Sequence, residues 1–257
     1  MRAIVFGGSG FLGRRVVAEL RRRGIDTDAP PRRQLDLTDY GRLREYLTGR
    51  PCELLFNCAA LTDLDYCERC PPRAGEINWL LPGLLARWSR ANLRTVHVTT
   101  DYAVEPVQEY GRQKALGEEE FWLQPGCVGI RLQVRLGGLY DADRGLPAKI
   151  MRATAAAPMA LIQGRVGLFM PADWAAARIV EAAIPGQLSR CGRVCLWSDW
   201  QNPWQIGCEL RGLESPAIVR LPIGRQVCFP ARPTHGQLRH TDEPQIAVWP
   251  GGLPCPA

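Results

Sequence analysis

The segment Gly7-Gly8-Ser9-Gly10-Phe11-Leu12-Gly13 stands between a short apolar run, Ala3–Phe6, and an amphipathic run, Phe11–Arg23. Every third residue from Gly7 is a glycine, which tolerates a positive φ in a tight turn and lets the backbone approach a ligand closely. A turn between a strand and a helix also presents free N–H groups and the positive helix end to phosphates. The segment therefore predicts a dinucleotide-binding turn, with a glycine-rich turn that binds no ligand as the alternative. The predicted contact residues are Gly7, Gly10, Phe11, Leu12 and Gly13.

The same alternation continues along the chain. Up to residue 132, short apolar runs alternate with amphipathic runs, which is typical of repeated βαβ units. The predicted strands are Ala3–Phe6, Ile25–Ala29, Leu54–Cys58, Thr95–Thr99 and Val128–Leu132. The predicted helices are Phe11–Arg23, Tyr40–Leu47, Ala74–Ala91 and Tyr110–Trp122. This order predicts an α/β fold of the Rossmann type, a doubly wound parallel sheet with a small C-terminal substrate lobe.

The pattern weakens after residue 135, where proline and glycine become frequent. A helix over Asp173–Ala183 and a strand over Val194–Trp197 are still predicted. From Pro222 the proline-rich tail is expected to be irregular. We therefore expect a dinucleotide-binding core over residues 1–135. Residues 136–257 are expected to form a substrate-binding lobe and tail interleaved with that core.

Composition narrows the class of protein. The chain has 257 residues, 46% hydrophobic and 23% charged, which suffices for a sizeable folded core. Its formal net charge of +6 is scattered, which favours a small anionic ligand over nucleic acid. No apolar run is long enough to span a membrane, and no signal peptide fits before the first strand. We expect a cytoplasmic protein without a membrane partner, and a homodimer stays open.

The ten cysteines are irregularly spaced, which indicates free thiols rather than a disulfide framework. Cys67 and Cys70 form a lone C-x-x-C pair with no second pair to complete a metal site. We interpret this pair as structural and predict no metal.

The type of dinucleotide depends on the segment after the second predicted strand. Asp28 is a candidate for the acid that binds the ribose hydroxyls of NAD. Arg32 and Arg33 instead suit the 2′-phosphate of NADP, because a guanidinium pairs with phosphate bidentately. We favour NADP(H) over NAD(H), while a solvated loop stays the alternative for both arginines.

Tyr110 and Lys114 are four residues apart on a predicted helix and therefore share one face. A nearby ammonium favours the phenolate and is expected to bring the phenol into the range of acid–base catalysis. Only Lys114 and Lys149 are lysines among 32 basic residues, so a lysine here suggests a task that arginine cannot perform.

Two strand ends are expected to meet this helix. Thr99 and Thr100 end the strand before it, and a hydroxyl there points into the crevice where cofactor and substrate meet. Thr100 can hydrogen-bond a substrate oxygen as negative charge develops on it. Asn57-Cys58-Ala59-Ala60 ends the preceding strand, where small residues let a cofactor lie against the backbone.

Several of these motifs, taken in order, resemble the dTDP-4-dehydrorhamnose reductase family of extended short-chain dehydrogenases. The resemblance is strong over residues 1–131 and faint beyond them. It rests on Gly7–Gly13, Asp36-Leu37-Thr38-Asp39, Asn57-Cys58-Ala59-Ala60 with Thr62-Asp63, Asp65 to Glu68, Asn78, Thr100-Asp101-Tyr102, and Tyr110-Gly111-Arg112-Gln113-Lys114 with Gly117-Glu118.

The resemblance implies a catalytic trio of Thr100, Tyr110 and Lys114. Tyr110 would donate a proton to a ketone oxygen while NADPH delivers hydride to the carbon. By the same resemblance Asp36 and Leu37 would flank the adenine, and Cys58, Ala59, Ala60 and Thr99 would line the cofactor. The implied substrate contacts are Thr62, Asp101 and Tyr102.

The loop between Tyr102 and Glu109 is shorter than the substrate-contacting loop of the family. The carbonyl substrate is therefore expected to be either a small or a nucleotide-linked metabolite. The sequence thus predicts an NADPH-dependent reductase of a ketone or an imine. The alternatives are a catalytically silent NADP-binding regulatory subunit and an NAD-dependent sugar-nucleotide epimerase or dehydratase.

Overall fold

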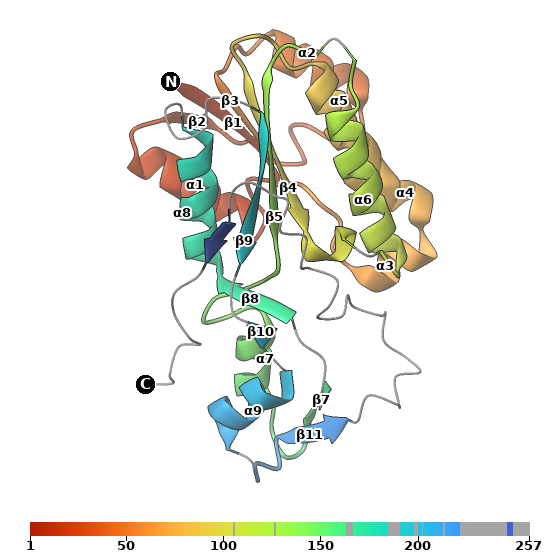
Figure 1. Ribbon diagram of the computed structural model, residues 1–257, viewed down its shortest axis with the longest axis vertical. Coiled ribbons are helices and arrows are strands. Elements are labelled where there is room, and N and C mark those ends of the chain that lie inside the picture. Colours follow the sequence, from red (N-terminus) through yellow and green to blue (C-terminus); the bar gives the residue numbers. More distant parts are fainter. Residues whose placement is uncertain are drawn as a thin grey trace.

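A computed structural model describes residues 1–104, 106–125, 127–162, 167–184, 191–197, 200–201, 203–212, 214–221 and 246–248. Its centre is a seven-stranded sheet in the order β12-β9-β5-β4-β3-β1-β2, and all of its strand pairs are parallel (Figure 1). The strands are β1 (Arg2–Phe6), β2 (Asp26–Asp28), β3 (Leu54–Asn57), β4 (Arg94–Thr100), β5 (Ile130–Leu136), β9 (Gly192–Trp197) and β12 (Ile246–Val248). The predicted Rossmann-type parallel fold is confirmed.

Helices cover both faces of this sheet (Figure 1). On one face, α1 (Gly13–Arg22) and α8 (Ala172–Ala183) enclose an apolar core that includes Val16, Leu20 and Ile179. On the other face lie α2 (Tyr40–Thr48), α5 (Leu81–Arg87) and α6 (Glu109–Trp122). The apolar spacing that predicted α1 is the spacing of the side chains that it buries against the sheet.

The sheet order creates a crevice beside β1. The chain leaves β1 for β2 on one side and then returns to β3 on the other side. In open parallel sheets, ligands bind outside the carboxyl ends of strands at such a switch point. The glycine turn after β1 and the Asn57–Ala60 segment after β3 meet at this point.

A smaller part lies below the sheet in Figure 1. Its strand β8 pairs with β6 and β10, its strand β7 pairs with β11, and it has an apolar cluster of its own. Its elements are β6 (Gly138–Tyr140), α7 (Leu146–Arg152), β7 (Met159–Ile162), β8 (Gly167–Pro171), β10 (Trp200–Gln201), α9 (Pro203–Arg211) and β11 (Ile218–Leu221). Most of the proline-rich tail lies outside the described residues. The expectation of an irregular tail is wrong at Ile246–Val248, because these residues pair with β9 at the sheet edge.

The predicted helix Ala74–Ala91 is also wrong in detail. A helix α3 (Leu64–Arg69) and a short helix α4 (Pro71–Gly75) come first, a π-helical turn η1 (Glu76–Leu80) follows, and then α5 begins. Pro82 has no N–H to donate to the carbonyl of Asn78, so the regular α-helical ladder cannot continue there. The N–H of Leu81 instead bonds the carbonyl of Glu76, five residues back. The proline thus places a π turn where periodicity alone predicted a continuous helix.

The last strand of the first half is longer than predicted. It runs over Ile130–Leu136 rather than Val128–Leu132, and the part beyond Leu132 includes two polar residues, Gln133 and Arg135. Gln133 accepts a hydrogen bond from the indole of Trp122, and Arg135 forms an ion pair with Glu118. Because both polar side chains have partners on α6, the strand continues through them. Within the described residues, no helix combines the length and apolar character needed to cross a bilayer.

Candidate active site

The glycine turn has the geometry that its sequence predicts. Gly7 has a φ of +74°, and a Cβ on it would lie 2.7 Å from the backbone nitrogen of Ala59. The N–H of Gly10 donates to the carbonyl of Gly7 at 2.9 Å, which closes the turn. The N–H groups of Phe11 and Leu12 have no hydrogen-bond partner among the described residues. Such free donors at the start of a helix suit a phosphate.

A cavity of about 550 Å³ opens beside this turn. It extends from the glycine turn across the end of β3 to the segment before α2 and to η1. Eight of the predicted cofactor residues line it, namely Gly7, Gly10, Arg32, Asp36, Leu37, Cys58, Ala59 and Ala60. The structure thus brings residues from four separate parts of the sequence to one site.

Other predicted residues lie outside this lining. Phe11, Leu12 and Gly13 form the start of α1, and Arg33, Thr62 and Thr99 do not line the cavity. A further wall comes from residues that sequence reasoning missed, namely Tyr66, Arg73, Glu76 and Ile77. Tyr66 lies on α3, Arg73 on α4, and Glu76 and Ile77 at the start of the π turn. The expectation of a continuous helix over Ala74–Ala91 gave no sign that Glu76 and Ile77 would face a cavity.

The two candidates for ribose recognition have different surroundings. Asp28 accepts a hydrogen bond from the Tyr46 hydroxyl at 2.5 Å, and Arg50 lies 3.7 Å from its carboxylate. It does not line the cavity. Arg32 does line it, with its side chain 84% exposed and 3.8 Å from the carboxylate of Asp36. Asp28 is therefore bound to protein partners, whereas Arg32 is accessible to a ligand.

Asp36 is oriented by the residue two positions further along. The backbone N–H and the hydroxyl of Thr38 both donate to Asp36 Oδ1, at 3.0 and 2.8 Å. These bonds lower the pKa of the Asp36 carboxyl, and Arg32 and Arg73 lower it further. An ionised carboxylate fixed in this way can accept a hydrogen bond from a ligand amino group.

Two of the predicted catalytic residues, Tyr110 and Thr100, lie beside each other. Tyr110 is 8% exposed near the start of α6, and Thr100 at the end of β4 lies beside its phenol and acts to lower the pKa of that phenol. Thr100 also donates to the carboxylate of Asp101 at 2.9 Å. The ring of Tyr102 packs edge-on against Tyr110, with 5.8 Å between centroids. Two of the predicted substrate contacts, Asp101 and Tyr102, therefore surround the phenol, whereas Thr62 is exposed on the loop after β3.

The expected effect of the lysine on the phenol is not what the structure shows. Burial raises the pKa of Tyr110 above its usual value, and the neighbouring Asp101 and Tyr102 raise it further. The ammonium of Lys114 donates to the carbonyl of Val98 at 2.9 Å. Its charge is therefore directed at the backbone of β4 in this structure. The phenol keeps its proton at neutral pH, which suits a group that donates one.

Lys114 is 1% exposed. Burial lowers the pKa of Lys114 to about 8, and the Glu118 carboxylate opposes this fall. Cys58 is the other ionisable group that lies near the ammonium. Cys58 also lines the cavity, and burial raises the pKa of its thiol to about 12, so it stays neutral. The cavity therefore adjoins Lys114 at Cys58.

The Cys67 and Cys70 pair has a structural environment. Cys67 Sγ lies 3.4 Å from the carbonyl of Leu61, and the amide of Asn78 donates to it at 3.8 Å. Both cysteines carry free thiols. Within the described part of the chain, no group of three or more potential ligands could hold a metal ion.

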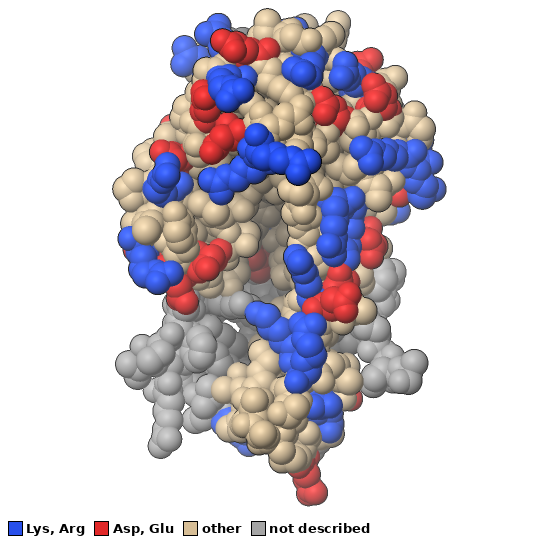
Figure 2. Space-filling model, turned by 180° about the vertical axis from the view of Figure 1, so that it is seen from behind, with Lys and Arg blue, Asp and Glu red and all other residues tan. Residues whose placement is uncertain are grey.

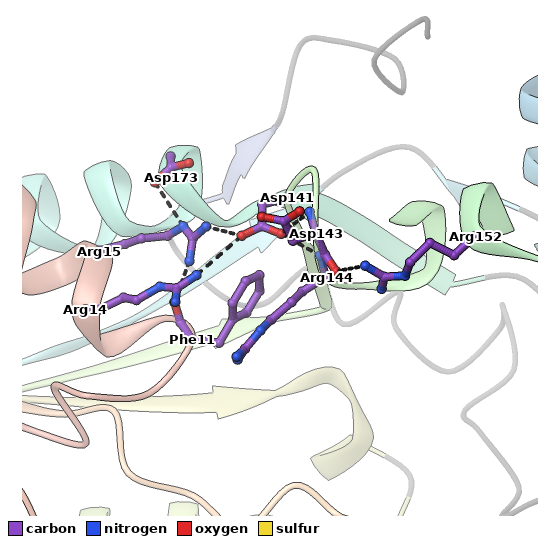
Figure 3. A network of polar contacts seen from close by, with 8 residues as sticks. All are labelled: Phe11, Arg14, Arg15, Asp141, Asp143, Arg144, Arg152 and Asp173. Carbon is purple, nitrogen blue, oxygen red and sulfur yellow. Dashed lines mark hydrogen bonds and ion pairs between the residues drawn. The ribbon is translucent and has the colours of Figure 1, made fainter. Parts of the chain in front are cut away.

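Charged residues hold the start of α1 against the smaller part of the molecule (Figure 3). Asp141, after β6, pairs with Arg15 and lies 3.6 Å from Arg14. Arg15 also pairs with Asp173 of α8 at 2.9 Å, and its guanidinium lies 4.5 Å from the centre of the Phe11 ring. The helix start that follows the glycine turn is thus held in place by ion pairs with two other parts of the chain.

The molecule seen from behind is hollowed near its middle, and Lys and Arg side chains lie along the upper and right-hand rim of this hollow (Figure 2). A rim of this sign attracts anionic ligands. Some of the basic residues counted in the composition therefore lie where they can attract a small anionic molecule.

The fold and the site define a Rossmann-type α/β protein with a cavity at the switch point of its sheet. Residues 1–185 match the family described as the RmlD substrate binding domain, and the chain belongs to this family.

Its relatives include reductases of sugar metabolism. The chain is 33% identical over 169 residues to a probable low-salt glycan biosynthesis reductase of Haloferax volcanii, which covers 56% of each chain. It is 31% identical over 134 residues to a dTDP-4-dehydrorhamnose reductase of Mycolicibacterium smegmatis, covering 46% of this chain and 40% of that protein. The chain thus spans about half the length of the curated relatives it matches.

Solved structures share the fold over nearly the whole chain. A hypothetical dTDP-4-dehydrorhamnose reductase from Sulfolobus tokodaii matches with a TM-score of 0.78 and 21% identity, covering 96% of this chain and 92% of that one. A dTDP-4-dehydrorhamnose reductase from Bacillus anthracis in complex with NADP matches with a TM-score of 0.78 and 18% identity, covering 90% and 88%.

Proposed function

We propose that this protein is an NADPH-dependent reductase that transfers hydride to a ketone of a nucleotide-linked sugar. The observation that supports this proposal is the cavity at the switch point, whose lining residue Cys58 lies near the predicted catalytic residue Lys114. The names of its relatives, which are reductases of dTDP-linked keto sugars, support the substrate class.

The residues of the cavity suit a dinucleotide. The free N–H groups of Phe11 and Leu12 can bind a pyrophosphate, and the absence of a Cβ at Gly7 leaves the turn close to Ala59. Asp36 offers an oriented carboxylate to an adenine amino group, and Arg32 offers a guanidinium to a 2′-phosphate. When bound, the cofactor would supply the hydride.

The chain's own residues would handle the carbonyl oxygen. Tyr110 would donate its phenolic proton to that oxygen, because burial keeps the phenol protonated at neutral pH. The hydroxyl of Thr100 would donate a second hydrogen bond to that oxygen by turning its single proton away from Asp101. Lys114 would use the donors that are not engaged with Val98 to hold a ribose hydroxyl.

We also propose a preference for NADPH over NADH. Asp28, the alternative partner for a ribose with a free 2′-hydroxyl, is engaged by Tyr46 and lies outside the cavity lining. Arg32 lines the cavity and carries the charge that a 2′-phosphate requires.

The test is an assay of NADPH oxidation with dTDP-4-dehydrorhamnose and with a panel of other keto-sugar nucleotides and small ketones. We expect one NADPH to be consumed for each ketone reduced. Binding of NADPH without turnover of any carbonyl would instead favour a regulatory subunit. A bound cofactor that is recycled rather than consumed would favour an epimerase or dehydratase.

A further inference from the structure

A buried ion pair lies beside Lys114. Arg135 on β5 donates to Glu118 on α6 through two nitrogens, at 3.3 and 2.6 Å. Glu118 is 7% exposed, and it also accepts a hydrogen bond from the hydroxyl of Thr99 at 2.8 Å. Burying an ion pair costs free energy, because both charges lose water. The groups that contact the pair therefore indicate which part of the structure it stabilises.

The ion pair holds the part of β4 that carries the site. Thr99, which donates to Glu118, stands between Val98 and Thr100. Val98 provides the carbonyl that accepts from Lys114, and Thr100 lies beside the phenol of Tyr110. Lys114 and Glu118 are one helical turn apart on α6, so both anchor the same helix face to consecutive residues of one strand.

The charges around Lys114 show which neighbour sustains its ammonium form. Burial disfavours that form, and Glu118 is the first of the groups that oppose burial. The other titratable groups near Lys114 are either uncharged at pH 7 or separated from Lys114 by Glu118. They are Cys58 after β3, His97 on β4, Tyr110 one turn earlier on α6, and Arg135 on β5.

We propose that Glu118, fixed by Arg135 and Thr99 one helical turn from Lys114, is a positioning residue that holds the side chain of Lys114 in its place beside β4. This role rests on the proposed function, in which the ammonium form of Lys114 binds the cofactor. The carboxylate has no contact with the reacting atoms and acts only through Lys114.

The chain allows a direct test, because Lys114 and Lys149 are its only lysines. Lysine labelled with ¹³C at Cε gives two side-chain signals, and a Lys149→Arg variant assigns them. The titration of Lys114 is then followed by NMR in the wild type, in Glu118→Gln and in Glu118→Asp. Glu119→Gln is the matched control, because Glu119 is the next residue of α6 and its side chain is exposed.

We expect Glu118→Gln to lower the pKa of Lys114 by about one unit, a tenfold loss of proton affinity. Glu118→Asp keeps the charge, so the pKa of Lys114 in this variant is expected to lie between the values in the wild type and in Glu118→Gln. Glu119→Gln is expected to leave the pKa of Lys114 unchanged. NADPH affinity should fall at a correspondingly lower pH in Glu118→Gln, whereas a purely structural defect would weaken it equally at every pH.

An unmoved Lys114 titration in Glu118→Gln would overturn the inference, as would an equal shift in Glu119→Gln. If Glu118→Gln does not fold, Glu118→Asp decides the question by the same comparison with Glu119→Gln. The NMR titration needs no substrate. A shifted titration without any ketone reduction would therefore refute the proposed function and leave the electrostatic role of Glu118 standing.

Discussion

Arg32 and Arg33 are neighbours in sequence, but only Arg32 lines the cavity. We predict that Arg32→Ala weakens NADPH binding by about 10- to 100-fold, because a charged hydrogen bond to a phosphate contributes about 1.5 to 3 kcal/mol. NADH binding should change little, since NADH has no 2′-phosphate. Isothermal titration with both nucleotides measures the difference.

Arg33→Ala is the matched control for this experiment. It removes the same charge from the adjacent position. It should therefore reduce the difference between the affinities for NADPH and NADH less than Arg32→Ala does. Equal effects of the two variants would show that long-range charge, rather than a contact, sets the preference.

At the residue scale, much of the candidate site could be predicted from sequence. The glycine turn, the Asn57–Ala60 segment and the Tyr110–Lys114 pair each have a fixed spacing with a physical reason. The direction of the Tyr110 pKa could not be predicted. It depends on the burial of the phenol and on Asp101 and Tyr102, which a helical spacing does not reveal.

At the element scale, the contact between α6 and η1 depends on a glycine. A Cβ on Gly117 would lie 2.3 Å from the carbonyl oxygen of Asn78, which the proline at position 82 leaves without its usual donor. We predict that Gly117→Ala lowers the free energy of unfolding by about 1 to 3 kcal/mol, since an added methyl in a packed contact forces the helices apart. Urea unfolding monitored by circular dichroism measures this loss.

Gly41 in α2 provides the control. A Cβ there would lie 3.6 Å from the nearest heavy atom, the carboxylate of Asp39, which is ordinary contact. Gly41→Ala should raise the free energy of unfolding by about 0.5 to 1 kcal/mol, because alanine loses less backbone entropy in a helix. A Gly117→Ala variant as stable as Gly41→Ala would contradict the account of this contact.

Elements with regular periodicity could be predicted, and elements interrupted by specific contacts could not. α1 follows from Val16, Val17 and Leu20, which bury one helix face. The π turn arises from a single proline, and the extension of β5 depends on partners that Gln133 and Arg135 find on α6. Glu76 and Ile77 were missed at the site for the same reason, since they belong to the π turn and line the cavity.

At the scale of the whole molecule, Asp141 links the start of α1 to the smaller part below the sheet (Figure 3). We predict that Asp141→Asn lowers the free energy of unfolding by about 1.5 to 3 kcal/mol, because Arg15 is only 12% exposed and loses a charged partner. Chemical denaturation at pH 7 measures the loss. Asp143→Asn is the control, since Asp143 is exposed on the same loop, and it should change stability by less than about 0.5 kcal/mol.

The pH dependence of stability gives a second test of this link. Burial acts to raise the pKa of Asp141, but bonds from the backbone of Asp143 and Arg144 and from Arg15 outweigh it, so the pKa lies below its usual 3.8. A lowered folded pKa means that the stabilisation is present above pH 3.8 and is lost as the pH falls through the folded value. The difference between the wild type and Asp141→Asn should therefore shrink in acid, and a constant difference down to pH 2 would contradict this assignment.

The smaller part of the molecule could hardly be predicted from sequence. Its strands are short, it combines three-stranded and two-stranded sheets, and its apolar cluster joins Tyr140, Ile150 and Ile206 from distant positions. Short strands carry too few residues for a clear alternation of side chains. The proposed division at residue 135 therefore remains a prediction.

The central claim, that the phenol of Tyr110 protonates a ketone beside a bound nicotinamide, is tested most directly by Tyr110→Phe. Turnover and NADPH affinity should be measured on the same preparation. The account predicts that kcat falls by about 10² to 10⁴, the usual contribution of a general acid, while the Kd for NADPH stays within a few-fold. A Tyr110→Phe variant that reduces the ketone at the wild-type rate would contradict it.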